Sequence, residues 1–312
     1  MFSRHLAIIP LLCAALLASS KLLACPGADR EALQWLDRMS HSLRKLSYHG
    51  VVTLRQGEEL EVMQVWHSVD GSASSGHLAR LTGQGGQVSR DDHPLECVHP
   101  GQQLLRVGEA MRDGECGLAE LYRFSVIESR PVAGRDTVGI LVEPRDMYRF
   151  GYRLAIDRET GLLLQSETLG NRDKPLENLA FTRVVYEAEQ PHAGDAHVLH
   201  LAAHPHPRDV SVDFPVQRPW TVTWLPRGFT LTDAPARKSG RRSYTDGLAV
   251  FSVFLEDLDR DIRPGEGVVR RGSTTSYTRG RRLSERPVLI TVVGEVPVNT
   301  ARMVADTVRW VQ

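Results

Sequence analysis

Short apolar stretches separated by tight-turn signals make up most of this chain from residue 50 onward. Turn sequences such as Gln56-Gly57, Asp70-Gly71 and Asp113-Gly114 divide stretches that are too short to form helices. Strands joined by such tight turns pair antiparallel, because a parallel connection needs a crossover of about a dozen residues or more. The pattern therefore predicts antiparallel meanders and argues against a fold built from βαβ units.

One amphipathic helix precedes the strands, and Asp29 is suited to cap it. Apolar residues then recur at helical spacing, at Leu33, Leu36, Met39, Leu43 and Leu46. Such a stripe needs an apolar surface to cover, so we expect a long, curled antiparallel sheet with the helix inside it, whose inner face lines either a packed core or a cavity. The strands predicted for it are Gly50–Leu54, Leu60–His67, His77–Leu81, Gln103–Val107, Phe124–Arg130, Thr137–Val142, Arg149–Asp157, Leu162–Thr168 and Leu176–Tyr186.

A second, smaller unit follows a change in composition. Residues 188–215 contain four prolines and no sustained alternation, and we interpret them as a linker. The strands predicted beyond it are Thr221–Trp224, Ser243–Tyr244, Leu248–Glu256, Ser276–Arg282 and Val288–Val293. A helix follows, capped by Asn299 or Thr300, with an apolar side that runs from Ala301 to Val311. The sequence thus predicts an α+β protein with a β-rich domain at 25–187 and a small α+β domain at 216–312.

Residues 1–24 have the form of a secretory signal peptide. Arg4 and His5 are followed by an apolar run from Leu6 to Leu17 and then by small residues. The run is shorter than the roughly 20 apolar residues that span a bilayer. We therefore predict export.

Three of the four cysteines, Cys25, Cys97 and Cys116, remain after removal of this segment. An odd number calls for an explanation in an oxidising compartment. Cys97 and Cys116 flank a predicted hairpin, and a disulfide between them would stabilise the fold by about 3 kcal/mol in the chain-entropy model. Leu22-Leu23-Ala24-Cys25 resembles a lipoprotein lipobox, so Cys25 either carries lipid or remains a free thiol after cleavage near Ala24.

Charge is unevenly divided between the two units. The whole chain has 38 basic and 38 acidic residues, which argues against a nucleic-acid binder. Residues 216–312 have 16 basic and 10 acidic residues, whereas residues 25–215 have 20 basic and 28 acidic ones. The basic surface is suited to anionic lipid headgroups, acidic protein segments or the acidic neighbouring unit, although solvated loops would give the same composition.

No cofactor or metal site is predicted. The linker carries five histidines, at His192, His197, His200, His204 and His206. Because neither a cysteine nor an acidic residue completes a coordination set, a solvated segment that gains charge below about pH 6.5 is favoured over a metal site. The chain also lacks GxGxxG, GxSxG, Walker A, HExxH and CxxC motifs, and no Ser/His/Asp spacing marks a hydrolase, so we predict that it is not an enzyme.

Distinctive strings occur from about residue 30 to residue 310. In the first unit they are Tyr48-His49-Gly50, Trp66-His67, Val132–Arg135, Pro144–Leu154 and Asp157–Leu164. In the second unit they are Trp224–Phe229, Tyr244–Leu248 and Thr291–Pro297. In this order they resemble the RseB/MucB family, periplasmic negative regulators of the envelope-stress sigma factor of the sigma-E or AlgU type.

The resemblance implies a large first domain similar to the LolA/LolB lipoprotein carriers, an unclosed antiparallel β-barrel wrapped on helices. It also implies a function in binding. Such proteins hold the periplasmic segment of a transmembrane anti-sigma factor, shield it from regulated proteolysis, and release it when lipid or lipopolysaccharide binds. A lipid or lipoprotein carrier without an anti-sigma partner is the alternative, and a homodimer is left open. The candidate contacts with partner or lipid headgroup are Arg145, Tyr148, Arg149, Arg241, Arg242, Arg281 and Arg282.

Intact-mass spectrometry of the exported protein tests the signal and cysteine predictions together. We expect a chain that begins near Cys25 and weighs two hydrogen masses less than its reduced form, because Cys97 and Cys116 are joined. A diacylglycerol adduct on the first peptide would show that Cys25 is lipidated. A chain that keeps residues 1–24, or whose oxidised and reduced masses agree, would contradict these predictions.

Overall fold

The computed structural model describes residues 29–70, 73–81, 87–90, 117–186, 216, 218–232, 239–258 and 265–311. The signal segment, the linker with its histidines, and the predicted strand Gln103–Val107 lie outside these ranges. Cys25, Cys97 and Cys116 lie outside them as well, so the predictions on these segments stay predictions.

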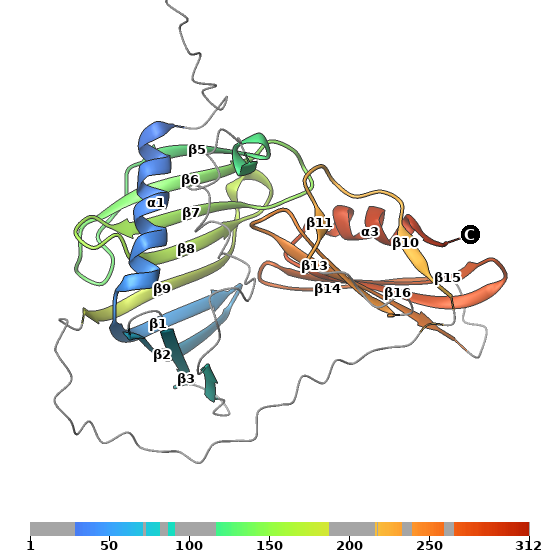
Figure 1. The fold of residues 1–312 in the computed structure, drawn as a ribbon, viewed down its shortest axis with the longest axis horizontal. Coiled ribbons are helices and arrows are strands. Elements are labelled where there is room, and N and C mark those ends of the chain that lie inside the picture. Colours follow the sequence, from blue (N-terminus) through green and yellow to red (C-terminus); the bar gives the residue numbers. More distant parts are fainter. Residues whose placement is uncertain are drawn as a thin grey trace, which may run out of the picture.

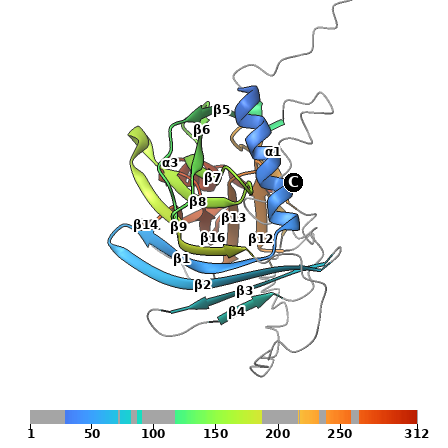
Figure 2. The same ribbon diagram turned by 90° about the vertical axis from the view of Figure 1, so that its left-hand side faces the viewer.

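The N-terminal unit is one nine-stranded antiparallel sheet with the order β4-β3-β2-β1-β9-β8-β7-β6-β5. Its strands are β1 (Tyr48–Gln56), β2 (Glu59–Asp70), β3 (Ala73–Arg80), β4 (Gln87–Arg90), β5 (Tyr122–Ile127), β6 (Thr137–Pro144), β7 (Gly151–Asp157), β8 (Leu163–Leu169) and β9 (Pro175–Tyr186). Two meanders meet where β1 pairs with β9, and a register shift between Val51 and Val52 marks that contact. The sheet curls without closing, with β4 and β5 at its edges, as Figure 2 shows. This confirms the predicted unclosed antiparallel barrel.

Helix α1 (Arg30–Lys45) crosses the inner face of this sheet (Figure 1). Asp29 caps it as predicted, since its carboxylate accepts the backbone N–H of Glu31 at 2.9 Å. The buried side chains Ala32, Leu36 and Met39 lie on one side of the helix, because they recur at helical spacing. They pack in one cluster with apolar residues of β5, β6 and β7, so the helix covers the sheet half that ends at β5.

The turn between β7 and β8 holds the second half of α1. Arg38 donates to the carbonyl of Glu159, and the Ser42 hydroxyl donates to the carbonyl of Thr160. Gly161 follows with φ of +80°, and a Cβ there would lie 2.6 Å from the Ser42 hydroxyl oxygen. Only glycine adopts this positive φ without strain and also leaves room for the Ser42 side chain.

The C-terminal unit is a six-stranded antiparallel sheet with the order β11-β12-β13-β16-β15-β14. Its strands are β11 (Thr230–Leu231), β12 (Arg241–Thr245), β13 (Val250–Asp257), β14 (Gly265–Arg271), β15 (Thr274–Leu283) and β16 (Arg286–Gly294). Helix α3 (Val298–Asp306) packs on one face, beside a two-stranded sheet of β10 (Trp220–Val222) and β17 (Val308–Trp310). Their shared core includes Trp220, Phe251, Tyr277, Ile290 and Val304. The predicted small α+β architecture is confirmed.

Three sequence predictions in this unit were wrong. Helix α3 begins at Val298 after Pro297, so Asn299 and Thr300 lie inside the helix and do not cap it.

The last helix ends at Asp306, not at Val311, and Val308–Trp310 forms β17, in which Trp310 pairs with Trp220. The spacing from Val304 to Val308 suits a helix, but Val308-Arg309-Trp310 also alternates as a strand does, and pairing with β10 decides the outcome. Strand β14 was missed, because its two glycines and exposed valines give no apolar alternation.

Candidate functional site

The most buried polar contacts between the two units centre on Asp246, in the turn between β12 and β13. One carboxylate oxygen accepts the backbone N–H groups of Leu248 and Ala249, each at 2.8 Å. The other accepts the Tyr122 hydroxyl at 2.9 Å and the Arg149 guanidinium at 2.8 Å, both from the N-terminal unit. One side chain thus shapes its own turn and binds the opposite unit. We call Tyr122, Arg149 and Asp246 the Asp246 joint.

Arg149 lies in the connection between β6 and β7, just before the strand in which the sequence placed it. Its guanidinium also donates to the Asp146 carboxylate at 3.1 Å and to the carbonyl of Arg227 at 2.6 Å. The aromatic rings of Tyr122 and Phe229, one from each unit, lie 5.5 and 5.2 Å from its central carbon. Arg149 therefore contacts the C-terminal unit through charge, hydrogen bonds and ring faces.

Water is excluded from the Asp246 joint. The side chains of Arg149 and Asp246 are both 0% exposed. Burial raises the pKa of the Tyr122 hydroxyl well above its ordinary value, and the Asp246 carboxylate adds to the effect, so Tyr122 stays a hydrogen-bond donor. A buried ion pair of this kind is tolerated only while every member is hydrogen-bonded.

A second contact joins the tip of the β14–β15 hairpin to the N-terminal sheet. The Glu177 carboxylate on β9 accepts the Ser273 hydroxyl and the Gln56 side-chain amide, each at 2.9 Å. Arg271 pairs with Glu59 at 2.7 Å and with Glu61 at 3.1 Å at the start of β2. The two units are therefore held together at two separated places.

Apolar packing and backbone contacts continue between the units. Leu248, beside Asp246, is 3% exposed and belongs to the apolar cluster under α1. Tyr148 meets Trp224 edge to face with ring centres 5.3 Å apart, and its carbonyl accepts the buried Thr300 hydroxyl at 2.9 Å. Leu248 of the C-terminal unit thus packs into the core of the N-terminal unit.

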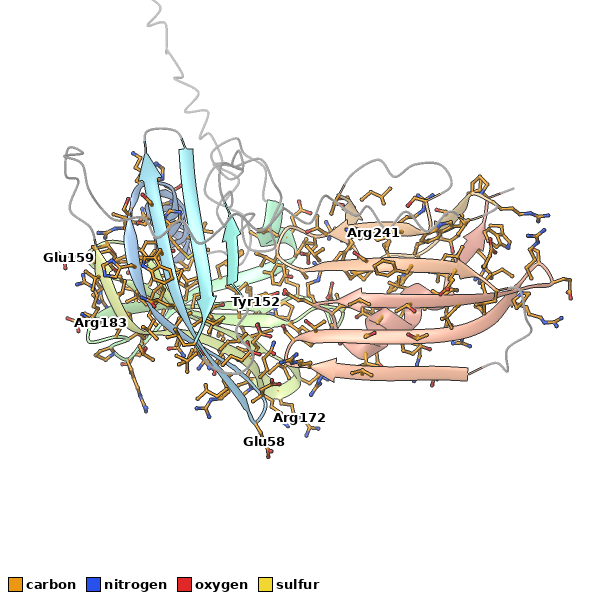
Figure 3. All side chains as sticks on the ribbon, turned by 90° about the horizontal axis from the view of Figure 1, so that it is seen from below. Glu58, Tyr152, Glu159, Arg172, Arg183 and Arg241 are labelled. Carbon is orange, nitrogen blue, oxygen red and sulfur yellow. The ribbon has the colours of Figure 1, made fainter. Side chains whose placement is uncertain are left out.

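Negative charges also meet across this boundary. Burial raises the pKa of Glu295, which follows β16, and the carboxylate of Glu177 raises it further. The Tyr152 hydroxyl is buried nearby without a hydrogen-bond partner among the described residues, and its pKa is raised by burial first and by Glu295 second. Figure 3 shows Tyr152 where the two sheets meet. Unlike the Asp246 joint, the surroundings of Glu295 disfavour its ionised form, so its burial at neutral pH is unfavourable.

The predicted contact residues fall into two groups. Arg145, Tyr148 and Arg149 come together in the connection after β6, where Arg149 pairs with Asp146. Arg149 is fully enclosed, so in this structure it contacts the other unit and not an external molecule.

The remaining predicted residues lie on β12 and β15 and do not join that group. Arg241 is exposed on the C-terminal sheet (Figure 3), and the Arg242 guanidinium lies 4.8 Å from the centre of the Trp220 ring. Arg281 donates to the carbonyl of Asp306, and Arg282 lies 3.6 Å from Glu285. Contact with a partner or lipid stays a prediction for these residues.

Sequence reasoning missed several residues of the boundary, namely Tyr122, Glu177, Asp246, Ser273, Glu295 and Thr300. Only Asp246 carried a signal, because Asp246-Gly247 is a turn sequence whose carboxylate is suited to accept N–H groups two and three residues later. The other partners come from distant parts of the chain, and no local pattern brings them together.

Beside α1 there is an open pocket of about 630 Å³. It is lined by Asp29, Arg30, Glu31, Gln34, Trp35 and Arg38. Its lining is mainly charged, so it does not have the apolar walls that acyl chains require. Among the described residues, no cluster of His, Cys, Asp and Glu is arranged to hold a metal, and no helix there is long and apolar enough to cross a membrane.

The fold and the Asp246 joint define a structural class: two-unit proteins in which a buried ion pair joins two antiparallel sheets. Models of the MucB/RseB N-terminal domain and of the MucB/RseB C-terminal domain match residues 31–199 and 215–309. The chain therefore belongs to the MucB/RseB family, as the resemblance implied.

The similarity to named proteins extends over nearly the whole chain. The sigma factor AlgU regulatory protein MucB of Pseudomonas aeruginosa is 31% identical, over 94% of this chain and 96% of that protein. A crystal structure of MucB in complex with MucA(peri) matches with a TM-score of 0.70 and 29% identity, over 90% of this chain and 99% of MucB. A crystal structure of MucB alone matches with a TM-score of 0.61 and 30% identity, over 91% of this chain and 100% of MucB.

Replacing Asp246 tests the joint. We expect Asp246→Ala to lower the free energy of unfolding by about 3–5 kcal/mol, because Arg149 stays buried without its partner. The matched control is Glu120→Gln, which removes an ion pair with Arg227 across the same boundary. Both of those side chains are largely exposed, so the control should cost at most about 1 kcal/mol. Urea unfolding measures both variants, and equal losses would contradict the assignment.

Glu295→Gln tests the opposing charges. Because the folded pKa of Glu295 is raised, its contribution to stability is present below its unfolded pKa and is lost as the pH rises through the folded value. We therefore expect the glutamine variant to be more stable than the parent at pH 7.5, with the difference shrinking toward pH 4. Thermal unfolding across this range measures it, and a difference independent of pH would refute the prediction.

Proposed function

We propose that this chain is an exported regulatory binding protein that holds the periplasmic domain of a transmembrane anti-sigma factor. While bound, the anti-sigma factor is shielded from regulated proteolysis, and the envelope-stress sigma factor stays restrained. Binding of lipid or lipopolysaccharide to this chain releases the anti-sigma factor. The observation that carries the proposal is the likeness along the whole chain to MucB, whose structure in complex with MucA(peri) is known.

The placement of the two units supports the partner-binding part. This chain matches MucB in complex with MucA better than MucB alone, at similar coverage and identity. A TM-score over two units falls when their relative orientation differs, even where each unit is alike. We therefore take the arrangement held by the Asp246 joint as the one that binds the anti-sigma factor.

Lipid-triggered release is supported by the unclosed sheet and by the pocket beside α1. Arg30 and Arg38 supply guanidinium groups at its rim, and Trp35 supplies an apolar wall. Guanidinium groups suit the phosphates of an anionic lipid headgroup. A lipid that binds the N-terminal unit in a different arrangement would shift the joint, and the anti-sigma affinity would fall by linkage.

The test uses the purified mature chain and the periplasmic domain of the anti-sigma factor from the same organism. We expect calorimetry to detect binding, the complex to resist protease longer than the free domain, and added lipid A to lower the affinity. Asp246→Ala should weaken binding, whereas Glu120→Gln should not, because only the former opens the buried joint.

The outcomes separate the parts of the proposal. No anti-sigma binding, with lipid co-purifying instead, would replace it with a carrier function. If lipid A leaves the affinity for the anti-sigma domain unchanged, lipid-triggered release is contradicted and partner binding still stands. Binding without slower proteolysis would contradict the shielding.

A further inference from the structure

Three arginines meet at the end of helix α3, where Asp306 is the last helical residue. The backbone carbonyl of Asp306 accepts the guanidinium of Arg281 at 2.9 Å and that of Arg309 at 2.7 Å, so one oxygen atom binds two cations. The Asp306 carboxylate pairs with a third cation, Arg279 of β15. We call Arg279, Arg281 and Arg309 the arginine triad.

The arginine triad carries more positive charge than its surroundings neutralise. Against three guanidinium groups, Asp306 supplies one negative charge and the C-terminal end of a helix supplies about half a charge. The adjacent Glu266 adds nothing, because it pairs with Arg302. Burial lowers the pKa of Arg281, and the charge of Arg309 lowers it further. An anion from outside the chain would balance this excess.

Much of the hydrogen-bonding capacity of the arginine triad is unused. A guanidinium has five N–H groups. Within the described residues, Arg281 donates one hydrogen bond, and Arg309 makes both of its bonds through a single nitrogen. The Arg279 side chain is 36% exposed, and Arg309 is exposed as well. The outward N–H groups therefore suit the oxygen atoms of phosphate groups.

The arginine triad lies at the end of the C-terminal unit that is remote from the N-terminal unit. Ser273, just before β15, contacts Glu177 of the N-terminal sheet, and from Ser273 to Arg281 a strand advances about 26 Å. Helix α3 likewise contacts the N-terminal unit through Thr300 in its first half and ends at Asp306. Figure 1 shows the C-terminal unit extending away from the first sheet. The triad therefore faces outward from the whole molecule.

An exposed apolar side chain accompanies the arginine triad. Val308 of β17 is buried in the core, so Arg309 lies on the opposite, outer side of the strand. Val311 follows two positions later on the same side as Arg309, and it is 50% exposed. Basic groups beside an exposed apolar side chain suit a bilayer interface, because the apolar group can enter the boundary with the acyl chains. An acidic peptide would use the guanidinium groups and leave Val311 in water.

The charge of the whole molecule favours one orientation at a negative surface. Residues 216–312 have 16 basic and 10 acidic residues, whereas residues 25–215 have 20 basic and 28 acidic ones. The connection between β13 and β14, residues 259–264, has two residues of each sign and leaves the balance unchanged. A negative surface therefore attracts the C-terminal unit and repels the N-terminal unit.

We propose that the end of the C-terminal unit that carries the arginine triad and Val311 docks on an anionic bilayer surface, with the N-terminal unit directed away from it. Headgroup phosphates accept the outward N–H groups of the triad. This contact lies far from the pocket beside α1 and does not depend on the proposed function. Where the anti-sigma factor is anchored in the same membrane, docking also raises the effective concentration of one chain near the other.

Vesicle binding tests the proposal. The protein is the mature chain with Cys25→Ser, which excludes any lipid attached at Cys25. We expect it to sediment with vesicles of about 30% phosphatidylglycerol in phosphatidylcholine but not with phosphatidylcholine alone, and to be released as salt rises from about 0.05 to 0.5 M. Arg309→Glu should weaken binding by roughly tenfold or more, because a repulsive charge replaces an attractive one.

Two further variants make the result specific. Arg183→Glu is the matched control, since it makes the same charge change at an exposed residue of the N-terminal unit (Figure 3) and should alter vesicle binding by at most about twofold. Arg309→Gln removes the charge but keeps a donor for the carbonyl of Asp306, so it tests the site if Arg309→Glu fails to fold. It should weaken binding by about fivefold, and circular dichroism checks the fold of each variant.

Three results would overturn the proposal directly: a parent protein that does not bind phosphatidylglycerol vesicles, equal binding to phosphatidylcholine, or equal losses in Arg309→Glu and Arg183→Glu. Arg309 variants that bind vesicles like the parent but lose affinity for the anti-sigma domain would also overturn it and assign the arginine triad to an acidic peptide. Vesicle binding is measured without the anti-sigma domain, so its outcome is separate from that of the proposed function.

Discussion

A fully buried ion pair between Arg149 and Asp246 is the contact on which the relation between the two sheets depends. Each charge would be strongly hydrated if the units came apart, so burying it is favourable only when all its hydrogen bonds form together. Asp246 meets this condition with two backbone N–H groups, the Tyr122 hydroxyl and the Arg149 guanidinium. A contact with this requirement is either complete or open, and it therefore selects one relative placement.

The charge of Glu177 adds to burial in raising the pKa of Glu295, so the ionised form of Glu295 is disfavoured at this boundary. Like charges near a buried boundary oppose closure, and here they lie beside a Tyr152 hydroxyl that lacks a hydrogen-bond partner among the described residues. The boundary thus combines a specific buried ion pair with a buried carboxyl group whose ionised form is disfavoured. Such a balance allows a ligand with modest differential affinity to shift the population, which release of a bound partner by lipid would require.

The sequence predicted much of the fold because the first unit is a meander. Apart from the pair of β1 with β9, its strands pair with strands that are near in sequence. Turn signals and alternation were therefore sufficient to predict β6 to β9, and the Asp29 cap and apolar stripe were sufficient for α1. Where pairing depends on distant residues, prediction failed. Val308–Trp310 becomes a strand only because β10, which is distant in sequence, lies beside it. Strand β14 was missed for another reason: its partner β15 follows directly, but its own sequence shows no apolar alternation.

The boundary was harder to predict because its contacts join residues that are distant in sequence. Arg149 was named from its string, but its partner lies 97 positions away. Tyr122 begins a strand in which nothing distinguishes its hydroxyl from that of any core tyrosine. The Asp246-Gly247 turn was visible in the sequence as a turn, whereas the use of its second carboxylate oxygen depends on the packing of the other unit.

Net charge favours the approach of the two units, whereas the buried pair of Arg149 and Asp246 determines their relative orientation. The exposed pairs between the units follow the overall imbalance: Arg227 and Arg271 of the basic unit meet Glu120, Glu59 and Glu61 of the acidic one. The buried pair runs the other way, with an arginine of the acidic unit inserted beside an aspartate of the basic unit. Exposed pairs are weak and screened by salt, so they favour approach without selecting an orientation. The orientation must come from the reversed, buried pair, which any arrangement driven by net charge alone would leave unsatisfied.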